Sequence, residues 1–273
     1  MIVATAGHVD HGKTSLIRGL TGVETDTLAE EIERGLSINL GYAYLSQASD
    51  HTLGFIDVPG HRRFINTMIS GISGVDMGLL VVAADDGPMP QTLEHIDVLD
   101  ILGVEALCVV INKVDRVDAL RVSEVLQQVD ALLQTRRWPE HVSFAVSSQS
   151  GQGLEALKKH LVTAAETHQR QRNTGGFRLS IDRSFNINGV GLVVTGTASA
   201  GEVKKGDLLE LLPGGQSVRI RHVRANNCEV DGASAGQRVA LALAGKVSQK
   251  QIERGDWLVT PNGPPLSLRL DVE

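Results

Sequence analysis

Two patterns of apolar and polar positions divide the chain. Up to about residue 165, short apolar runs alternate with longer segments of helical periodicity. The apolar runs predict strands and the periodic segments predict helices. The predicted strands are Ile2–Ala6, Leu53–Asp57, Met77–Ala83, Ala106–Ile111 and Val142–Val146, with helices near 14–20, 62–71, 91–102, 118–136 and 153–167. This alternation favours an α/β fold with a mostly parallel, doubly wound sheet that binds its ligands at the carboxyl ends of the strands.

The pattern changes at Phe177, where six short strand-like runs follow one another without helices. Turn signals such as Pro213-Gly214-Gly215 separate them, which predicts a small all-β barrel. The predicted barrel strands are Phe177–Phe185, Gly191–Thr197, Leu208–Leu212, Val218–Ala225, Gln237–Leu243 and Trp257–Thr260. The polar stretch 168–176 ends in a glycine pair and is predicted to be a linker. We therefore expect a first domain over residues 1–170 and a barrel over residues 175–263.

Composition narrows the class of protein. The 42% hydrophobic and 21% charged residues are ordinary for a soluble globular protein. With only Cys108 and Cys228, no disulfide framework or zinc site is expected, and a reducing cytoplasm fits. The first strand begins directly after Met1, which leaves no room for a signal peptide, and no apolar run approaches the roughly 18 residues of a membrane span.

The net charge of −6 is unevenly distributed along the chain. Residues 1–176 hold 14 basic and 22 acidic residues, a net charge of −8, whereas residues 177–273 hold 12 and 10, a net charge of +2. The second part is therefore the better place for a polyanionic partner.

One short motif gives the strongest chemical signal. Residues 7–15 fit the pattern G-x-x-x-x-G-K-[ST], and they lie between a predicted strand and a predicted helix. In this phosphate-binding loop, backbone N–H groups cradle phosphates, Lys13 reaches the outer phosphates and the Thr14 hydroxyl ligates Mg²⁺. The alternative is a plain glycine-rich turn. The predicted phosphate-binding residues are Gly7, His8, Val9, Asp10, His11, Gly12, Lys13, Thr14 and Ser15, together with Gly60.

Three further motifs follow other predicted strands. Asp57 begins Asp-Val-Pro-Gly-His, in which the carboxylate holds Mg²⁺ through water and Gly60 lets a backbone N–H turn to the γ-phosphate. Asp115 ends Asn112-Lys113-Val114-Asp115, and its carboxylate can accept the two N–H donors that guanine has and adenine lacks. Asn112 and Lys113 would hold this loop and the face of the base. Ser147-Ser148 would complete the pocket with a backbone N–H to guanine O6. Each motif alone could be turn chemistry, but all four in order predict a guanine nucleotide site.

These motifs together resemble the translational GTPases of the elongation factor Tu group. Within that group, the chain is most similar to the selenocysteine-specific elongation factors. The resemblance also rests on the start at Met1 and on the short interval from Lys13 to Ser37. Further segments that carry it are 34–38, 40–44, 178–183 and 189–197.

The resemblance implies a GTPase that hydrolyses GTP to GDP with Mg²⁺ and delivers selenocysteinyl-tRNA to the ribosome in the cytoplasm, as a monomer in solution. It also implies that residues 264–273 begin a truncated third domain. An mRNA hairpin would then be read only by carboxyl-terminal domains that this chain does not contain, whether it is a fragment or a truncated gene product.

The resemblance also assigns roles to single residues. His61 would orient the attacking water, the alternative being a histidine in a surface turn. Val9 and Leu36 would form an apolar gate in front of His61, the alternative being ordinary loop packing. Ser37 stands where the family usually has Thr, so its hydroxyl would ligate Mg²⁺ without the methyl group that restricts χ1.

Arginines in the barrel suggest how the cargo would be chosen. A selenol is acidic enough to be anionic at neutral pH, so a pocket with arginine would select it over neutral serine. Asp182, Arg183 and Arg238 are the candidates, while Arg224 and His222 are weaker ones, and the alternative is that these arginines are solvated. The basic residues Lys204, Lys205, Arg219, Arg221 and Arg224 could contact tRNA phosphates or form a solvated strand face.

Two other functions remain open at this level. The chain could be another GTPase of the elongation factor Tu type, or a relative of an initiation factor, that binds a different tRNA. It could also be a nucleotide-sensing module that turns over little GTP and acts through partners.

Overall fold

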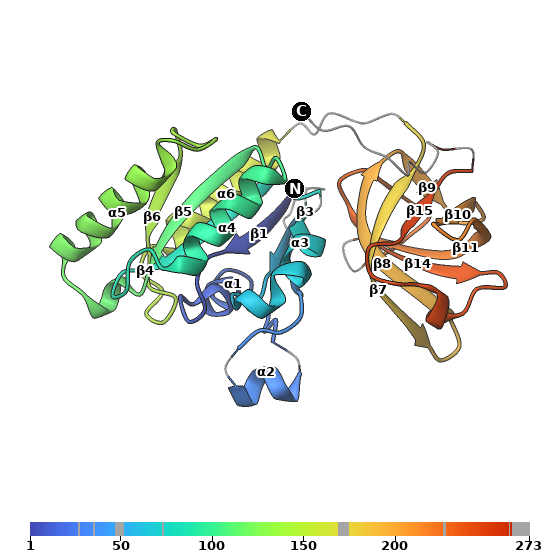
Figure 1. Ribbon diagram of the computed structural model, residues 1–273, viewed down its shortest axis with the longest axis horizontal. Coiled ribbons are helices and arrows are strands. Elements are labelled where there is room, and N and C mark those ends of the chain that lie inside the picture. The colour runs from blue at the N-terminus through green and yellow to red at the C-terminus, as the bar shows by residue number, and fades with distance from the viewer. Residues whose placement is uncertain are drawn as a thin grey trace. The chain divides into compact units, whose positions relative to one another are not determined.

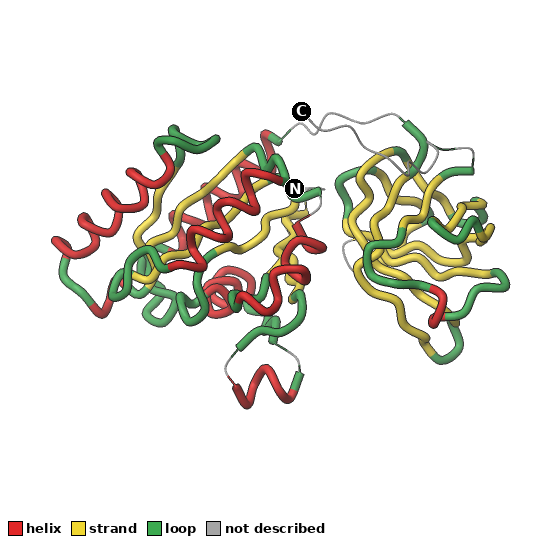
Figure 2. Tube along the Cα trace, viewed as in Figure 1, coloured by secondary structure: helices red, strands yellow, loops and turns green. Residues whose placement is uncertain are grey.

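The computed structural model describes residues 1–26, 28–34, 36–46, 52–72, 74–168, 175–225, 228–261 and 263. The chain splits into two compact units, Met1–Gln169 and Arg170–Glu273 (Figure 1). Figure 2 shows that the first unit mixes helices and strands, whereas the second consists almost entirely of strands. Residues 169–174 and 264–273, where much of the linker and the start of a third domain are predicted, lie outside the described residues.

A six-stranded sheet forms the centre of the first unit, in the order β2-β3-β1-β4-β5-β6. Five strands are parallel, and β2 pairs with β3 in the antiparallel direction. The strands are β1 (Ile2–Ala6), β2 (Gly41–Ser46), β3 (Thr52–Asp57), β4 (Met77–Ala83), β5 (Ala106–Asn112) and β6 (Val142–Ala145). Side chains of β1 and β4 are buried along their whole length, as expected for strands covered on both faces.

Helices cover both faces of this sheet, which confirms the predicted doubly wound fold. Apolar side chains of α1 (Lys13–Thr21) and α6 (Leu154–Thr167) pack in one cluster with one face. Those of α3 (Ile65–Ile72), α4 (Pro90–Ile101) and α5 (Ala119–Leu133) pack in a second cluster with the other face. Because the strands are parallel, their carboxyl ends open on the same edge of the sheet, where the predicted motifs follow β1, β3, β5 and β6.

Some elements of the first unit differ from the sequence prediction. The edge strand β2 and the short helix α2 (Ala29–Arg34) were not predicted, because neither is long enough to show a clear period. The helix predicted near 62–71 starts as a 3₁₀ turn, η1 (Arg62–Phe64), before α3 begins. The helix predicted to reach residue 136 ends at Leu133.

The second unit is a closed, six-stranded antiparallel barrel, as predicted. Its order is β10-β15-β7-β8-β14-β11, and pairing of β10 with β11 closes the ring. These strands are β7 (Arg178–Ile187), β8 (Gly191–Ala200), β10 (Leu208–Leu212), β11 (Gln216–Ala225), β14 (Arg238–Ala244) and β15 (Trp257–Val259). Three additional strands, β9 (Glu202–Lys204), β12 (Cys228–Val230) and β13 (Gly232–Ser234), have three residues each, too few for a period to be read.

A bulge between Ile181 and Arg183 shapes one side of the barrel. The register of β7 against β8 shifts there, while Gly196 of β8 allows the two strands to approach closely. A Cβ atom on Gly196 would lie 2.0 Å from the carbonyl oxygen of Ser180, so no larger residue fits without moving the strands. At the bulge, Asp182 and Arg183 of β7 lie opposite β8.

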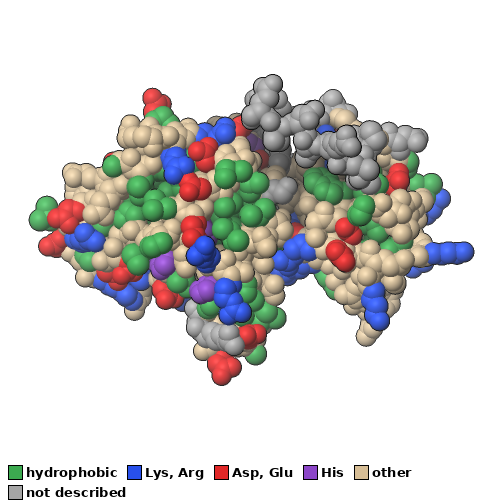
Figure 3. All heavy atoms as spheres, in the orientation of Figure 1, with side chains coloured by type: hydrophobic (Ala, Val, Ile, Leu, Met, Phe, Trp, Pro, Cys, Tyr) green, Lys and Arg blue, Asp and Glu red, His purple; other side chains and the backbone are tan. Residues whose placement is uncertain are grey.

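The surface of the molecule carries charges of both signs. In Figure 3, acidic and basic side chains are interspersed over the visible face, so the charge difference between the two parts of the sequence does not gather there into one patch. Among the described helices, none is long and apolar enough to cross a membrane.

Candidate functional site

A cavity of about 930 Å³ opens at the carboxyl edge of the sheet in the first unit. Most of the residues predicted to bind nucleotide line it. The predicted residues in its wall are Val9, Asp10, Gly12, Lys13, Thr14, Ser15, Leu36, Ser37, Gly60, Asn112, Lys113, Asp115 and Ser148. The sequence reasoning missed other residues in the wall, including Asp26, Glu31, Arg116 and Gln149. Five segments far apart in the sequence thus meet at one site.

Lys13 lies under the loop that precedes it. Its ammonium group donates hydrogen bonds to the carbonyl oxygens of Gly7 (3.0 Å) and His8 (2.7 Å), and the residue is 6% exposed. Burial lowers the pKa of Lys13 to about 8, although the nearby Asp57 carboxylate acts to raise it. A Cβ atom on Gly60 would lie 2.5 Å from the Lys13 Nζ, so a side chain at position 60 would displace the ammonium group.

Helix α4 holds the phosphate-binding loop from behind. The Gly7 N–H donates to Nδ1 of His95 and the Val9 N–H donates to Oε1 of Gln91, each at 3.0 Å. Gln91 and His95 are four residues apart, so they share one face of the helix. Burial lowers the pKa of His95 to about 3, which keeps the ring neutral and its Nδ1 available as an acceptor. Two N–H groups of the loop are therefore directed to α4, and any phosphate would be cradled by the others.

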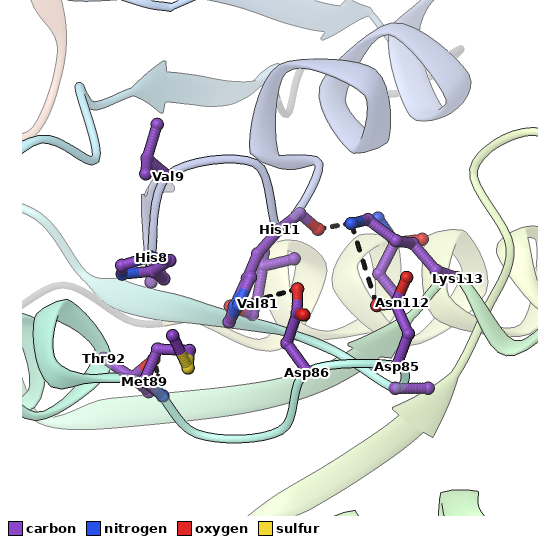
Figure 4. A network of polar contacts seen from close by, with 12 residues as sticks. His8, Val9, His11, Val81, Asp85, Asp86, Met89, Thr92, Asn112 and Lys113 are labelled. Carbon is purple, nitrogen blue, oxygen red and sulfur yellow. Dashed lines mark hydrogen bonds and ion pairs between the residues drawn. The ribbon is translucent and has the colours of Figure 1, made fainter. Parts of the chain in front are cut away.

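His11 is packed beneath the loop, as Figure 4 shows. Its Nδ1 lies 3.4 Å from the carbonyl oxygen of Val81, and its Nε2 lies 3.8 Å from a carboxylate oxygen of Asp86. The side chain has no exposed surface, and burial lowers the pKa of His11 to about 4. This geometry gives His11 a structural place in the loop and none in the cavity wall.

Asn112 links the phosphate-binding loop to the loop after β6. Its Nδ2 donates to the carbonyl oxygens of His11 (3.1 Å) and Gly12 (3.4 Å), and part of this network is drawn in Figure 4. Its Oδ1 accepts hydrogen bonds from the N–H (3.1 Å) and the hydroxyl (2.9 Å) of Ser148. The two sides of the cavity are therefore positioned by one buried amide.

The loops after β5 and β6 form the base end of the cavity. Lys113 has a left-handed backbone (φ +61°), and Asp85 lies 3.7 Å from its Nζ and 3.2 Å from Nη1 of Arg116. Although partial burial acts to raise it, Lys113 and Arg116 hold the pKa of Asp85 below its usual value. The N–H of Ser147 donates to the Gln152 carbonyl oxygen (2.9 Å), and the N–H of Ser148 is bonded to Asn112. Both serines thus use the N–H groups that were predicted to face guanine O6.

Oxygen atoms suited to a divalent cation gather beside Lys13. The hydroxyl oxygens of Thr14 and Ser37 are 3.1 Å apart, and Asp57 accepts hydrogen bonds from the hydroxyls of Thr5 (3.0 Å) and Thr25 (2.7 Å). Burial raises the pKa of Asp57. A bound cation would offset the free-energy cost of the buried Asp57 charge, and Mg²⁺ prefers oxygen ligands. The residues present therefore fit Mg²⁺.

Asp26 adds a second carboxylate to this region and was not predicted. Burial raises the pKa of Asp26, whereas a hydrogen bond from Ser37 acts to lower it. Within the described ranges no group of three or more His, Cys, Asp or Glu residues could hold a metal, so a cation here would depend on the hydroxyls as well.

His61 stands at the edge of this arrangement. Its Nδ1 accepts a hydrogen bond from the N–H of Arg63 (3.2 Å), which caps η1, and its ring lies 6.1 Å from that of Phe64. His61 is not among the residues that line the cavity, whereas Val9, Leu36 and Gly60 are.

The barrel contains a second polar cluster. The Arg238 guanidinium makes a two-pronged pair with the Asp182 carboxylate, and both residues are less than 10% exposed. Thr195 donates to the same carboxylate (2.7 Å), and Nε of Arg254 donates to the Asp182 carbonyl oxygen (3.0 Å). Arg183 follows Asp182 at the bulge. Arg183, Arg238 and Arg254 together carry three positive charges, whereas Asp182 carries one negative charge. Thr195 and Arg254 were not predicted.

The two weaker candidates lie on β11, the strand next to β14. Arg224 is exposed and pairs with Ala240 of β14, which in turn pairs with Thr195 of the Asp182 cluster. His222 is also exposed, and its Nδ1 lies 3.5 Å from the Glu229 carboxylate.

The fold and the cavity define a P-loop nucleotide-binding domain followed by a β-barrel, and known families match both parts. The model of the elongation factor Tu GTP binding domain matches residues 1–168, and that of elongation factor Tu domain 2 matches residues 191–259. The selenocysteine-specific elongation factor of Escherichia coli is 47% identical over the whole chain, which spans 44% of that relative. The chain therefore belongs to the elongation factor Tu family of translational GTPases, in the branch of the selenocysteine-specific elongation factors.

Solved structures agree with this assignment. A crystal structure of a bacterial selenocysteine-specific elongation factor, EF-Sec, has a TM-score of 0.90 and 38% identity, and the match covers 96% of this chain and 45% of the other. Elongation factor SelB from Methanococcus maripaludis, in complex with the GTP analogue GPPNHP, has a TM-score of 0.85 and 32% identity, covering 96% and 55%. The chain thus spans about half the length of these proteins.

The buried histidines predict how stability depends on pH. The pKa values of His95 and His11 are lowered to about 3 and about 4, so the unfolded chain binds more protons than the folded one below about pH 6.5. The free energy of unfolding should therefore fall as the pH drops below about 6.5, by up to about 1.4 kcal/mol per pH unit for each histidine.

His95→Gln should lower the slope of the free energy of unfolding against pH by the contribution of one proton, because glutamine does not titrate. The glutamine side-chain oxygen can still accept the Gly7 N–H. Denaturant unfolding between about pH 5 and 7 measures the slope. His160→Gln, elsewhere in the same unit, is the matched control. An unchanged slope in His95→Gln would show that the His95 ring is not held neutral.

Proposed function

We propose that this chain binds GTP and GDP with Mg²⁺ and hydrolyses GTP on the ribosome during delivery of selenocysteinyl-tRNA. The observation that carries the nucleotide part is the meeting of Lys13, Ser37, Gly60 and Asp115 in one cavity. The names of the similar proteins support the tRNA and ribosome part. Because the chain spans less than half of its Escherichia coli relative, the activity of the whole protein is included in this proposal.

The residues around Lys13 would bind and orient the phosphates. The Lys13 ammonium, already aimed by two loop carbonyls, neutralises charge on the outer phosphates together with the remaining loop N–H groups. Mg²⁺, held by Thr14 and Ser37 and through water by Asp57, would supply further neutralisation of that charge. The Gly60 N–H would turn to the γ-phosphate, and the packing of position 60 against Lys13 and Val9 supports this role.

His61 would orient the attacking water. In the structure it caps η1 through one hydrogen bond from Arg63, so it can turn toward the cavity by giving up that bond and its ring contact with Phe64. Val9 and Leu36 lie in the cavity wall and would form the apolar gate that His61 must pass. This arrangement would keep hydrolysis slow until a partner moves His61.

The base would be held by the loops after β5 and β6. Asp115 accepts the two guanine N–H donors, and Lys113, fixed beside Asp85, covers a face of the ring. Asn112 and Ser148 hold the loops together, while Ser147 stabilises its own turn. A backbone N–H of Ser147-Ser148 would donate to guanine O6, and Gln149, which lines the cavity together with Ser148, is a further candidate donor.

The barrel cluster would receive the aminoacyl end of the tRNA. A selenolate gains from the positive excess of Arg183, Arg238 and Arg254 over Asp182, whereas the neutral hydroxyl of serine gains less. Asp182 fixes Arg238 in place rather than leaving it mobile. Arg224 and His222 stay weaker candidates for this pocket, because both are exposed on the neighbouring strand β11, where they could also contact tRNA phosphates.

The proposal extends to the organisation of the protein. The first domain covers residues 1–170, the barrel residues 175–263, and residues 264–273 begin a third domain. The chain works as a monomer in the cytoplasm, and an mRNA hairpin is read by domains beyond those described.

His61→Ala tests the hydrolytic role. Without the imidazole, ribosome-stimulated hydrolysis should fall by about 10²–10⁴-fold, while GDP affinity stays within about twofold, because His61 is outside the cavity wall. Phosphate release is measured with and without ribosomes. Wild-type hydrolysis that ribosomes do not stimulate would favour a nucleotide-sensing module instead.

Arg183→Ala tests the cargo proposal, because it leaves the buried Asp182–Arg238 pair intact. Removing Arg238 itself would strand the Asp182 carboxylate and destabilise the barrel. The variant should lose affinity for selenocysteinyl-tRNA by about tenfold more than for seryl-tRNA, as a charged contact is removed. Arg219→Ala, on the exposed face of β11, is the matched control and should leave the ratio unchanged. Equal losses for both tRNAs in Arg183→Ala would refute the selectivity.

A further inference from the structure

One buried carboxylate joins the two ends of the segment that carries Leu36 and Ser37. Glu31 is 3% exposed, and its Oε2 accepts the N–H of Leu28 at 2.9 Å. Its Oε1 accepts the N–H groups of Ile38 (3.0 Å) and Asn39 (2.9 Å). The side chain therefore spans a loop of about ten residues with three charge-assisted hydrogen bonds.

The first of these contacts follows from helix chemistry. Leu28 immediately precedes α2, and the first N–H groups of a helix have no partner within it. A glutamate at the third helical position can reach back to the residue before the helix, as Glu31 does. A glutamate exposed to solvent could make this capping contact equally well. The burial of Glu31 and its second oxygen go beyond capping, because they fasten α2 to Ile38 and Asn39.

Apolar packing by the described α2 side chains does not provide this fastening. Among the described side chains of α2, none belongs to the three apolar clusters of the protein. Figure 1 shows α2 projecting from the first unit, away from the sheet. The Glu31 backbone contributes one more link, since its carbonyl oxygen accepts the N–H of Leu36 at 3.1 Å. Four hydrogen bonds to Glu31 thus hold Leu28, Leu36, Ile38 and Asn39.

This segment contributes two residues to the cavity wall. Leu36 and Ser37 lie between Glu31 and its partners Ile38 and Asn39, and both line the cavity. The Ser37 hydroxyl is 3.1 Å from that of Thr14. Without the Glu31 carboxylate, the segment would have to keep Ser37 beside Thr14 while it lacks these three hydrogen bonds.

We propose that Glu31 is a positioning residue, a latch that holds Ser37 and Leu36 at the phosphate end of the cavity. Its effect on nucleotide binding rests on the proposed function, in which Ser37 ligates Mg²⁺ when GTP is bound. The latch then supports GTP more than GDP, because only the GTP state uses the Ser37 hydroxyl. It acts through backbone amides and touches neither the nucleotide nor the attacking water.

Backbone amide exchange of the Glu31→Ala variant tests the latch itself. With a GTP analogue bound, we expect exchange at Leu28, Ile38 and Asn39 to be at least about tenfold faster than in the wild type. In the same variant, affinity for the GTP analogue should fall about tenfold and affinity for GDP less than twofold. Unchanged GDP binding also shows that the variant is folded.

Two further variants make the result specific. Glu33→Ala removes an exposed carboxylate from the same helix and should leave both exchange and affinity unchanged. Glu31→Gln keeps one acceptor oxygen, so protection should fall at Leu28 or at Ile38 and Asn39, but not at both. Wild-type exchange rates in Glu31→Ala would overturn the latch. Faster exchange in a protein that proves unable to hydrolyse GTP would retain the latch and remove the proposed function.

Discussion

Burial of the Lys13 ammonium is the constraint on which the rest of the site depends. A buried charge is costly unless it is paired and hydrogen-bonded, and here two carbonyl oxygens of the preceding loop provide those bonds. The loop must therefore curl over its own lysine, and position 60 must be glycine to leave room for Nζ. Burial still lowers the pKa of Lys13 to about 8. An anion of high charge at this place would relieve that cost, so the same constraint shapes a phosphate site.

The surrounding contacts spread this constraint over the first unit. His95 and Gln91 bind the loop to α4, and Asn112 binds it to the loop after β6. These contacts are made by side chains that are largely buried and have few alternative partners. The phosphate end and the base end of the cavity are therefore positioned together. Glu31 governs a more exposed segment in a similar way, through backbone amides rather than packing.

Much of this architecture could be predicted, because its signals are local. Parallel strands such as β4 are buried on both faces and read as continuous apolar runs, and the loop around Lys13 has a fixed spacing. The residues that hold the site were missed, because nothing local distinguishes His95 or Glu31 from other polar residues on helices. Their partners are 88 residues away for His95 and up to 8 for Glu31, and only the fold brings them together. The serines after β6 were predicted to contact the base, but no local signal indicated that Ser148 also binds Asn112.

Nucleotide titration tests the central claim, that the four strand ends form a guanine nucleotide site. Binding of GDP, ADP and XDP to the wild type and to Asp115→Asn is measured by calorimetry with Mg²⁺. The wild type should bind GDP at least about 10³-fold more tightly than ADP, since adenine cannot offer the Asp115 carboxylate the two N–H donors that guanine has. Asp115→Asn should lose most of its affinity for GDP and gain affinity for XDP, because its amide can donate to the xanthine oxygen. Equal binding of ADP and GDP by the wild type, or unchanged GDP binding by Asp115→Asn, would contradict the account.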